Sequence, residues 1–470
     1  MKKKYLYIPI EIFSREFDGM LLLSMLAVKD DWTVVLGGQK RLLPILKSLP
    51  KGVIILKSII PNALHWQKKL REYGHKITSI DAEGLVPSNG VSGVRLRFSQ
   101  ETIFHSDFVF LWGKSQYLNI KSVFPEIEEK GVLTCSPILD HWRFVKSNNL
   151  KSSSKSTKKT ILIATSFSYP NHFISKDFAI NSSLNSIGSE SEFAKDIILD
   201  AELQEYMLNK FRNLVWRVIK EFPQFNFILR PHPTEKKEFW GEIISNNCNV
   251  TFDKNSEITK SLIETSLFIH FNSTASVEAR YYDKDVFTFI PRDMPEKYSS
   301  RVSLHTQLSS VVASSEDEFI ENLYKFKNKF KFKYSLNIED IAFEANASNN
   351  LNASRKILDC LKSIQYYNSE SISIFNLKIA NMASKFTAIS IKRRLKWILG
   401  NLDHYFNVFG KKYRDSKFSF SYGKIKQPYI NKKVIRERIS EYSEINEFKG
   451  TKFSLKEPIN ELFILEKINN

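Results

Sequence analysis

The sequence predicts an α/β protein with two Rossmann-like parallel-sheet domains and a basic helical extension at the C-terminus. Short apolar runs bounded by turn residues alternate with segments of helical periodicity, which is typical of right-handed βαβ units. The chain has 470 residues, too many for a single hydrophobic core. Residues 148–160 are rich in Ser and Lys and lack apolar periodicity, which indicates a linker between the domains.

The first domain is expected at residues 1–147. Its short apolar runs end in turn or charged residues, as buried parallel strands do. No G-x-G-x-x-G sequence follows any of these runs, so the dinucleotide-binding fingerprint is absent. We expect strands at residues 5–10, 33–37, 53–56, 76–80, 108–112 and 132–135, and helices at residues 12–28, 40–49 and 65–73.

The second domain is expected at residues 161–364. The recurrence of Phe211, Leu214 and Val218 on one face predicts an amphipathic helix, and Pro223 ends its pattern. We expect strands at residues 161–164, 227–229, 250–252, 267–270 and 285–289, and helices at residues 203–221, 236–246, 258–265 and 275–281.

The extension at residues 365–470 carries more than half of the net charge of +18, which points to anionic partners. Residues 389–399 combine a basic run with Trp397, and such a helix can lie on an anionic bilayer. Two other interpretations stay open. The helix could pack across the two domains with its charges in water, or a compositional bias of the coding sequence could account for the excess of lysine.

The cysteines and the apolar segments bear on the compartment. Cys135, Cys248 and Cys360 lie far apart and form no CxxC pair, which argues against a cysteine zinc site or a disulfide scaffold. The N-terminal apolar run breaks at Glu11, too early for a signal peptide. Residues 20–28 are far shorter than the roughly 20 residues of a membrane-spanning helix. We expect a cytoplasmic protein, peripheral at the inner face of the plasma membrane.

The sequence Arg-Pro-His-Pro at residues 230–233 follows an apolar strand. Its two prolines fix φ, so a stiff turn presents Arg230 and His232. A guanidinium binds phosphate through two parallel hydrogen bonds, and a histidine can donate to a phosphate oxygen. The alternative is a proline-rich strand end with a surface arginine.

A second polar cluster follows the strand that ends at His270. Asn272, Ser273 and Thr274 lead into a short segment of helical propensity, and we expect Ser273 to be its N-cap beside a phosphate site. Glu278 lies five residues after Ser273, whereas a capping box needs three. Glu278 is therefore available for ribose hydroxyl groups. The alternative is an ordinary capped helix with a solvated glutamate.

Further candidates lie at other strand ends. The loop at residues 165–172, which contains Ser166, could touch a base or a phosphate. In the first domain a carboxylate that faces a ligand could serve as a general base, or it could complement a helix dipole. No P-loop, serine elbow or HExxH motif occurs, so no tightly bound metal is expected. The first-domain candidates are Glu11, Arg15, Glu16, Asp81 and Glu83.

Four motifs together resemble bacterial surface-carbohydrate biosynthesis proteins with a GT-B fold. They are IPIEIFSREFD near the N-terminus, DAEGL at residues 81–85, RPHP at residues 230–233 and HFNSTASVEA at residues 270–279. The chain looks like capsule Kdo and nonulosonate transferases and, more distantly, CDP-glycerol glycerophosphotransferases. The resemblance spans residues 5–290. It departs at Cys135-Ser136-Pro137-Ile138, where relatives show a Gly-Asn-Pro-Arg-like turn.

The resemblance implies roles for the candidate residues. The donor would be bound by the second domain and the acceptor by the first, with a cleft between them. Glu11, Glu16 and His232 would be catalytic, and Arg15, Asp81 and Glu83 would lie on the acceptor side. The donor-binding residues would be Ser166, Arg230, His232, His270, Asn272, Ser273, Thr274 and Glu278, with Glu278 on the ribose.

The expected function is metal-independent glycosyl transfer in capsule or lipopolysaccharide assembly. The donor would be a CMP-activated acidic sugar, Kdo or a nonulosonate, and the acceptor a glycan or a lipid-linked glycan. The nucleotide sugar is a substrate, and no cofactor is expected. One alternative is a polymerase that uses a CDP-alcohol. Another is a nucleic-acid-binding protein, which lacks support because no RNP, helix-turn-helix or zinc pattern accompanies the charge.

Overall fold

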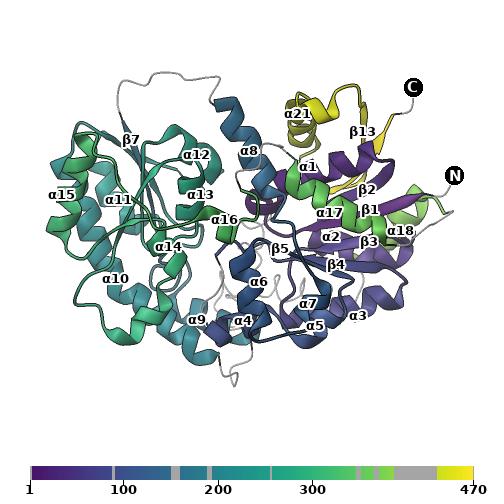
Figure 1. The fold of residues 1–470 in the computed structure, drawn as a ribbon, viewed down its shortest axis with the longest axis horizontal. Helices are drawn as coiled ribbons and strands as arrows, with labels where there is room; N and C mark the ends of the chain where they lie inside the picture. The colour runs from purple at the N-terminus through teal and green to yellow at the C-terminus, as the bar shows by residue number, and fades with distance from the viewer. Residues whose placement is uncertain are drawn as a thin grey trace, which may run out of the picture. The chain divides into compact units, whose positions relative to one another are not determined.

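The chain forms two compact units, and each is described by itself (Figure 1). Unit 1 comprises Met1–Pro87, Gly93–Val145 and Glu339–Asn470, and unit 2 comprises Ser88–Ser92 and Lys146–Ile338. The computed structural model describes residues 3–86, 90–149, 159–187, 193–253, 257–345, 351–364, 370–385 and 431–468.

Unit 1 contains an eight-stranded sheet with the order β13-β14-β2-β1-β3-β4-β5-β6. Neighbouring strands from β2 to β6 pair in parallel, whereas β14 pairs antiparallel with β2 and with β13. The strands are β1 (Lys4–Ile10), β2 (Trp32–Gly38), β3 (Val53–Leu56), β4 (Lys76–Ile80), β5 (Phe108–Leu111), β6 (Gly131–Leu133), β13 (Phe453–Ile459) and β14 (Leu462–Lys467).

Helices bury both faces of this sheet, which explains why β1 is apolar on both sides. Leu6 and Ile8 pack in a cluster with α1, α17 and α21, whereas Tyr5 and Tyr7 pack with α2, η1, α3 and α18. The helices of unit 1 are α1 (Phe13–Lys29), α2 (Gln39–Leu42), η1 (Leu43–Ser48), η2 (Pro61–Ala63), α3 (Leu64–Glu72), α4 (Gly90–Arg97), α5 (Gln100–Phe104), α6 (Lys114–Lys121), α7 (Ile127–Lys130), α8 (Ile138–Asn149), α16 (Ile338–Ile341), α17 (Asn352–Ser363), α18 (Ile374–Lys385), α21 (Lys432–Tyr442) and η4 (Asn446–Phe448).

The last third of the chain corrects two predictions. The second domain was expected to continue to residue 364, but α17 belongs to unit 1. The buried carboxylate of Asp140 on α8 accepts hydrogen bonds from the first backbone N–H groups of α17, those of Ala353 and Ser354, at 3.1 and 2.7 Å. This contact supplies the cap that the helix start needs.

The second correction concerns the extension, which was expected to be helical. Its last residues form the β13–β14 hairpin, and β14 completes the sheet along the edge of β2 (yellow and purple in Figure 1). Phe463 and Leu465 become buried in this pairing. Because β2 and β14 lie more than 400 residues apart, local periodicity carries no sign of the contact.

Unit 2 contains a six-stranded, fully parallel sheet with the order β12-β11-β10-β7-β8-β9. The strands are β7 (Thr160–Ala164), β8 (Asn226–Arg230), β9 (Val250–Phe252), β10 (Leu267–His270), β11 (Asp285–Phe289) and β12 (Val311–Ala313).

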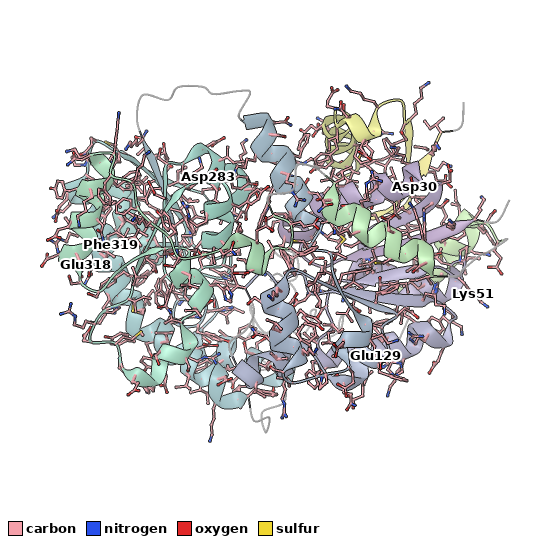
Figure 2. All side chains as sticks on the ribbon, viewed as in Figure 1. Asp30, Lys51, Glu129, Asp283, Glu318 and Phe319 are labelled. Carbon is pink, nitrogen blue, oxygen red and sulfur yellow. The ribbon has the colours of Figure 1, made fainter. Side chains whose placement is uncertain are left out.

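The helices of unit 2 cover its sheet with apolar faces. On α15, Phe319 is fully buried, whereas its neighbour Glu318 accepts hydrogen bonds from Ser314 at the helix start (both labelled in Figure 2). The helices are α9 (Lys176–Ile187), α10 (Ala194–Glu221), α11 (Glu238–Ser245), α12 (Ile258–Glu264), α13 (Ala275–Tyr281), η3 (Glu296–Arg301), α14 (Leu304–Leu308) and α15 (Glu316–Lys327).

The expected architecture of two α/β units is confirmed: the sheet of unit 2 is fully parallel, and the sheet of unit 1 is parallel except at β13 and β14. The expected helix over residues 40–49 is divided into α2 and a 3-10 turn at Pro44, because proline cannot donate to the helical ladder. Most of the predicted linker, residues 150–158, and the basic run at residues 389–399 lie outside the described residues. Among the helices that the structure describes, none has the length and apolarity to cross a bilayer.

Candidate functional site

The sheet of unit 2 places the predicted donor-binding residues at one edge. β7 lies between β8 and β10, and because all three are parallel, their carboxyl ends meet at the same edge. Arg230 ends β8, His270 ends β10, and Thr165 and Ser166 follow β7. Topology therefore gathers three segments that are separated along the chain.

Arg230 is held in an ion pair at this edge. Its Nη1 lies 3.1 Å from Oδ2 of Asp253, which also accepts a hydrogen bond from Ser261 Oγ at 2.7 Å. The Arg230 side chain is 18% exposed. Burial lowers the pKa of Arg230, and the carboxylates of Asp253 and Glu278 act against that shift. The guanidinium thus remains a cation beside two acidic groups.

Glu278 is buried rather than solvated, so the interpretation as a solvated helix residue is wrong. Its side chain projects from α13, is 6% exposed and accepts a hydrogen bond from Thr259 Oγ1. Burial raises the pKa of Glu278 to about 7, although Thr259 and Arg230 favour its charged form. Near neutral pH the carboxyl group therefore exists in both protonation states and can accept or donate a hydrogen bond.

His232 lies in the turn after β8 with a defined tautomer. Its Nδ1 accepts from the backbone N–H of Thr234 at 3.3 Å and lies 2.7 Å from Thr234 Oγ1. An acceptor nitrogen carries no proton, so the neutral ring has its proton on Nε2. The proline turn thus fixes a ring that can donate from Nε2.

His270 does not have the predicted phosphate-binding geometry. It is fully buried, its Nδ1 accepts from the Ser273 N–H at 3.1 Å, and its Nε2 lies 2.9 Å from Ser310 Oγ. Burial lowers the pKa of His270 to about 3, so the ring is neutral. Nδ1 holds the loop after β10, and Nε2 contacts the segment just before β12, so both ring nitrogens make structural contacts.

Asn272 has a similar structural role. Its φ of 48° turns the chain, its Nδ2 donates to the Arg301 carbonyl at 3.0 Å, and its Oδ1 accepts from the Ser303 N–H at 2.9 Å. The prediction of Ser273 as the N-cap of α13 is wrong: the helix begins at Ala275, as predicted, and its N-cap is Thr274, which makes no side-chain capping bond.

The exposed part of this loop is hydroxylated. Ser273 is half-buried and Thr274 is exposed, and both lie just before α13. Ser166, after β7, is half-buried at the adjacent strand end. Hydroxyl groups at these positions can donate to an oxygen-rich ligand.

Glu235 is a residue that the sequence did not single out, and it organises this edge. Its buried Oε1 accepts hydrogen bonds from Thr165 Oγ1 at 2.6 Å, from the Phe167 N–H at 3.1 Å and from the His232 N–H at 3.0 Å. Its Oε2 accepts from Asn171 Nδ2 at 3.2 Å and from Trp240 Nε1 at 3.1 Å. One carboxylate thereby ties the loop after β7 to the turn after β8.

The corresponding strand ends of unit 1 carry many more charges. Glu11, after β1, pairs with Lys57, after β3. Glu16 is 4% exposed and accepts from the N–H groups of Glu11 and Ile12 at 3.0 and 2.9 Å. Burial raises the pKa of Glu16 to about 7, although Lys57 and the two N–H groups favour ionisation. Glu16 thus caps the start of α1.

Asp81 and Glu83 follow β4 and share Arg97, and Glu83 also binds Arg15. Arg97 binds both carboxylates, through Nε to Asp81 at 2.9 Å and through Nη1 to Glu83 at 2.8 Å, and Arg15 binds Glu83 at 2.7 Å. Partial burial raises the pKa of Glu83, but Arg15 and Arg97 outweigh this effect and lower it to about 2. The predicted acceptor-side residues therefore form one ion-pair network.

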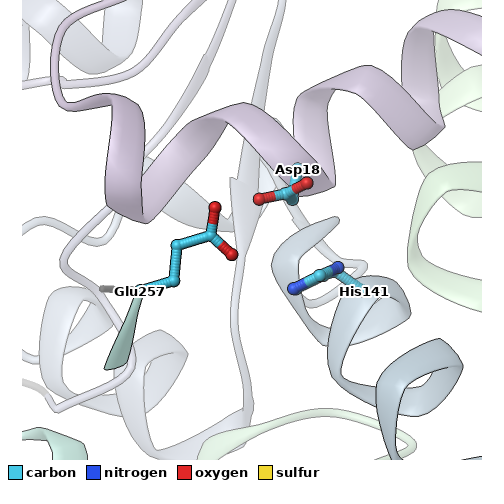
Figure 3. Close-up of side chains that lie close together, drawn as sticks. All are labelled: Asp18, His141 and Glu257. Carbon is cyan, nitrogen blue, oxygen red and sulfur yellow. The ribbon is translucent and has the colours of Figure 1, made fainter. Parts of the chain in front are cut away.

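A separate buried cluster in unit 1 joins α1, α8 and α21. Tyr442 Oη donates to Asp18 Oδ1 at 2.5 Å and lies 2.9 Å from His141 Nδ1. Figure 3 shows Asp18 on α1 and His141 on α8. Arg438 Nε lies 3.2 Å from Asp18 Oδ1. These bonds anchor the C-terminal helix to the first helix of the chain. Within each unit taken alone, no three of the described His, Cys, Asp and Glu side chains come close enough to share a metal ion.

No family model and no curated protein matches the sequence. Among solved structures, it is similar to S. aureus MnaA in a co-structure with UDP, at 13% identity and a TM-score of 0.46, over 79% of this chain and 99% of that chain. It is also similar to UDP-GlcNAc 2-epimerase from Neisseria meningitidis bound to UDP-GlcNAc, at 15% identity and a TM-score of 0.46, over 77% of this chain and 99% of that chain. A third similar structure is the wall teichoic acid polymerase TagF, at 10% identity and a TM-score of 0.41, over 77% of this chain and 90% of that chain. At these identities and scores the similarity assigns neither activity nor ligand to this chain.

Proposed function

We propose that this protein is a glycosyltransferase of bacterial surface-carbohydrate biosynthesis that uses a nucleotide-activated sugar. The observation that carries the proposal is the edge of unit 2 where Arg230 lies beside the buried Glu278, and where loops bearing hydroxyl groups follow the neighbouring strands β7 and β10. The proposed donor is a CMP-activated acidic sugar, Kdo or a nonulosonate. The proposed acceptor is a glycan or a lipid-linked glycan.

The chemistry of the leaving group supports this assignment. Glycosyl transfer from a nucleotide donor develops negative charge on the departing phosphate, and cationic or N–H donors stabilise that charge. Arg230 supplies a cation, and the Nε2–H of His232 supplies a donor fixed by Thr234. Ser273 and Thr274 supply hydroxyl groups on the neighbouring loop. We therefore place the donor phosphate at Arg230 and His232.

Glu278 would select the ribose. A carboxylate accepts hydrogen bonds from two vicinal hydroxyl groups, and the neighbouring Arg230 favours the ionised form that this requires. A ligand that brings two hydroxyl groups to Glu278 would lower its pKa further, because hydrogen bonds to the charged form favour it.

For the acceptor hydroxyl, Glu11 and Glu16 remain the proposed bases. A general base works best when its pKa is near the operating pH, and the pKa of Glu16 is about 7. Glu11 is one third exposed and is bound by Lys57, so it is the more accessible of the two. Arg15, Asp81 and Glu83 would orient the acceptor through their network.

The experiment measures nucleotide release and product mass with CMP-Kdo, a CMP-nonulosonate, CDP-glycerol and UDP-GlcNAc, each with a lipid-linked glycan acceptor and with EDTA. CMP release together with a sugar-extended acceptor supports the proposal. CMP release from CDP-glycerol with a glycerophosphate product would instead support the polymerase alternative. Epimerisation of UDP-GlcNAc without transfer, or no reaction with any donor, contradicts it.

A matched pair of variants locates the donor site. Arg230→Met should abolish most nucleotide release, whereas Arg212→Met should not, because Arg212 of α10 makes an exposed ion pair with Glu242. RNA binding that is tight, sensitive to salt and unchanged in Arg230→Met, without any transferase activity, would favour the nucleic-acid alternative.

A further inference from the structure

One helix near the end of the described chain exposes an apolar stripe. The inner face of α18 is fixed by Leu377, which is 1% exposed and packs in the cluster that contains Tyr5 and Tyr7. Four side chains of the same helix remain open to solvent. Their exposed fractions are 71% for Phe375, 59% for Met382, 50% for Ile379 and 47% for Ile374.

Three of these side chains, all except Ile374, lie on the face opposite to the buried one. Phe375, Ile379 and Met382 have the spacing i, i+4, i+7, and at about 100° per residue they fall within an arc of about 60°. The centre of that arc lies about 190° from Leu377 on the same helix. α18 is therefore anchored to unit 1 on one side and presents a continuous apolar row on the other.

The charge of α18 has one sign. The helix contains Lys378 and Lys385 and no acidic residue. Lys378 is exposed and lies beside Phe375 on the helix surface, about 60° away at the helical repeat. An apolar row flanked by lysine is the pattern of helices that lie in the interface of an anionic bilayer, where apolar side chains enter the acyl boundary and lysines remain at the phosphates.

We propose that Phe375, Ile379 and Met382, flanked by Lys378, form a docking surface for an anionic lipid bilayer. A second copy of the chain fits less well, because a twofold pairing of α18 would bring like charges at Lys378 together. The inference does not depend on the proposed reaction, since vesicle binding can fail while nucleotide release persists, and the reverse.

The test is flotation of the full-length protein with vesicles of phosphatidylcholine mixed with phosphatidylglycerol, and with vesicles of phosphatidylcholine alone. The wild type should float with the anionic vesicles. The variant Phe375→Ser/Ile379→Ser/Met382→Ser should lose roughly tenfold or more of its partitioning, because three apolar side chains no longer enter the bilayer. Lys378→Glu should weaken binding to anionic vesicles and reduce its sensitivity to salt.

Phe104→Ser is the matched control, because Phe104 on α5 is also 71% exposed and lies outside the stripe. It should float like the wild type, and circular dichroism should show all variants folded. A wild type that stays unbound, or a triple variant that floats as well as the wild type, overturns the proposal. The proposal is also overturned if analytical ultracentrifugation shows a dimer for the wild type and a monomer for the triple variant. Resistance of Phe375→Cys to a thiol reagent that modifies Phe104→Cys would show that another part of this chain covers the stripe, and would also overturn it.

Discussion

The strand ends of the two units differ in how their charged groups are exposed and paired. In unit 1, Glu11, Asp81 and Glu83 are each bound by a lysine or an arginine, and the pair between Arg15 and Glu83 is exposed by 49% and 42%. At the strand ends of unit 2, the Arg230–Asp253 pair is less exposed, at 18% and 19%, and Arg230 lies beside the buried Glu278.

The degree of exposure determines how much a charged group contributes to the free energy of unfolding. Exposed ion pairs contribute little because water screens them, whereas a buried carboxylate is strongly coupled to its hydrogen-bond donors. We therefore expect substitutions at the edge of unit 2 to affect stability and pH dependence much more than substitutions in the ion-pair network of unit 1.

The largest effect is expected from Glu235→Ala. Its removal leaves the Thr165 hydroxyl, the Trp240 Nε1–H and the Phe167 backbone N–H without their acceptor, and each such group costs about 1–3 kcal/mol. We expect unit 2 to lose on the order of 3–5 kcal/mol, measured by hydrogen exchange of its peptides. Glu238→Ala, at an exposed carboxylate of α11, is the control and should change little. A loss of the same size in both variants would mean that the hydrogen-bond hub does not matter.

Glu278 should make the stability of unit 2 fall between pH 4.5 and 7. Burial raises its pKa from 4.5 to about 7, so the native state binds the proton more tightly over this interval. This contribution is fully present below pH 4.5 and is lost as the pH rises through 7, and it amounts to about 3 kcal/mol. Glu278→Gln should flatten the profile of unit 2 and leave that of unit 1 unchanged.

Glu16 should have the same effect in unit 1, because burial raises its pKa to about 7 as well. The stability of unit 1 should therefore also fall between pH 4.5 and 7. Glu16→Gln should flatten only the profile of unit 1. If one variant flattened both profiles, the two units would not respond independently, and the comparison between them would fail.

Arg230→Met is expected to have an intermediate effect. Without this cation the pKa of Glu278 should rise above 7, and the half-buried Asp253 loses one partner while it keeps Ser261. We expect unit 2 to lose about 1.5–3 kcal/mol, the range for a hydrogen bond to a charged group. The pH midpoint of the stability profile of unit 2 measures this pKa shift. A midpoint equal to that of the wild type would show that Arg230 does not influence the ionisation of Glu278.

The smallest effect is expected from Glu83→Gln in unit 1. Each of its two pairs, with Arg15 and with Arg97, should contribute roughly 0.2–1 kcal/mol, less at high salt. Urea unfolding at low and high ionic strength measures it. A loss of several kcal/mol would show that the network of unit 1 is as strongly coupled as the edge of unit 2.

Local sequence patterns predicted most of the parallel strands. The apolar run ending at Leu56 and the run ending at His270 have the predicted limits, because burial on both faces demands unbroken apolar residues. β13 and β14 could not be predicted in this way. Their place in the sheet depends on pairing with the distant β2, and the basic composition around them indicated a helical extension instead.

The sequence predicted where the candidate residues lie in the sheet better than it predicted what each side chain contacts. Arg230 and His232 lie at the edge that their motif indicated. His270 is the last residue of β10, as predicted, but its ring is buried in the core, which its position at a strand end did not indicate. Glu235 follows the proline turn in a charged run that suggests solvent exposure. Its burial depends on donors such as Thr165 and Asn171, which come from a different strand end.

The β14–β2 pairing has a consequence for how the protein is made. During synthesis β2 leaves the ribosome early, and the strand that covers its edge follows more than 400 residues later. At about 5–20 residues per second this interval is on the order of a minute. Throughout it, the N–H and C=O groups along the edge of β2 lack their final partner and can template pairing with other nascent chains. Chaperone dependence and loss of yield on deletion of β14 should therefore appear in newborn protein, even where the finished fold is stable.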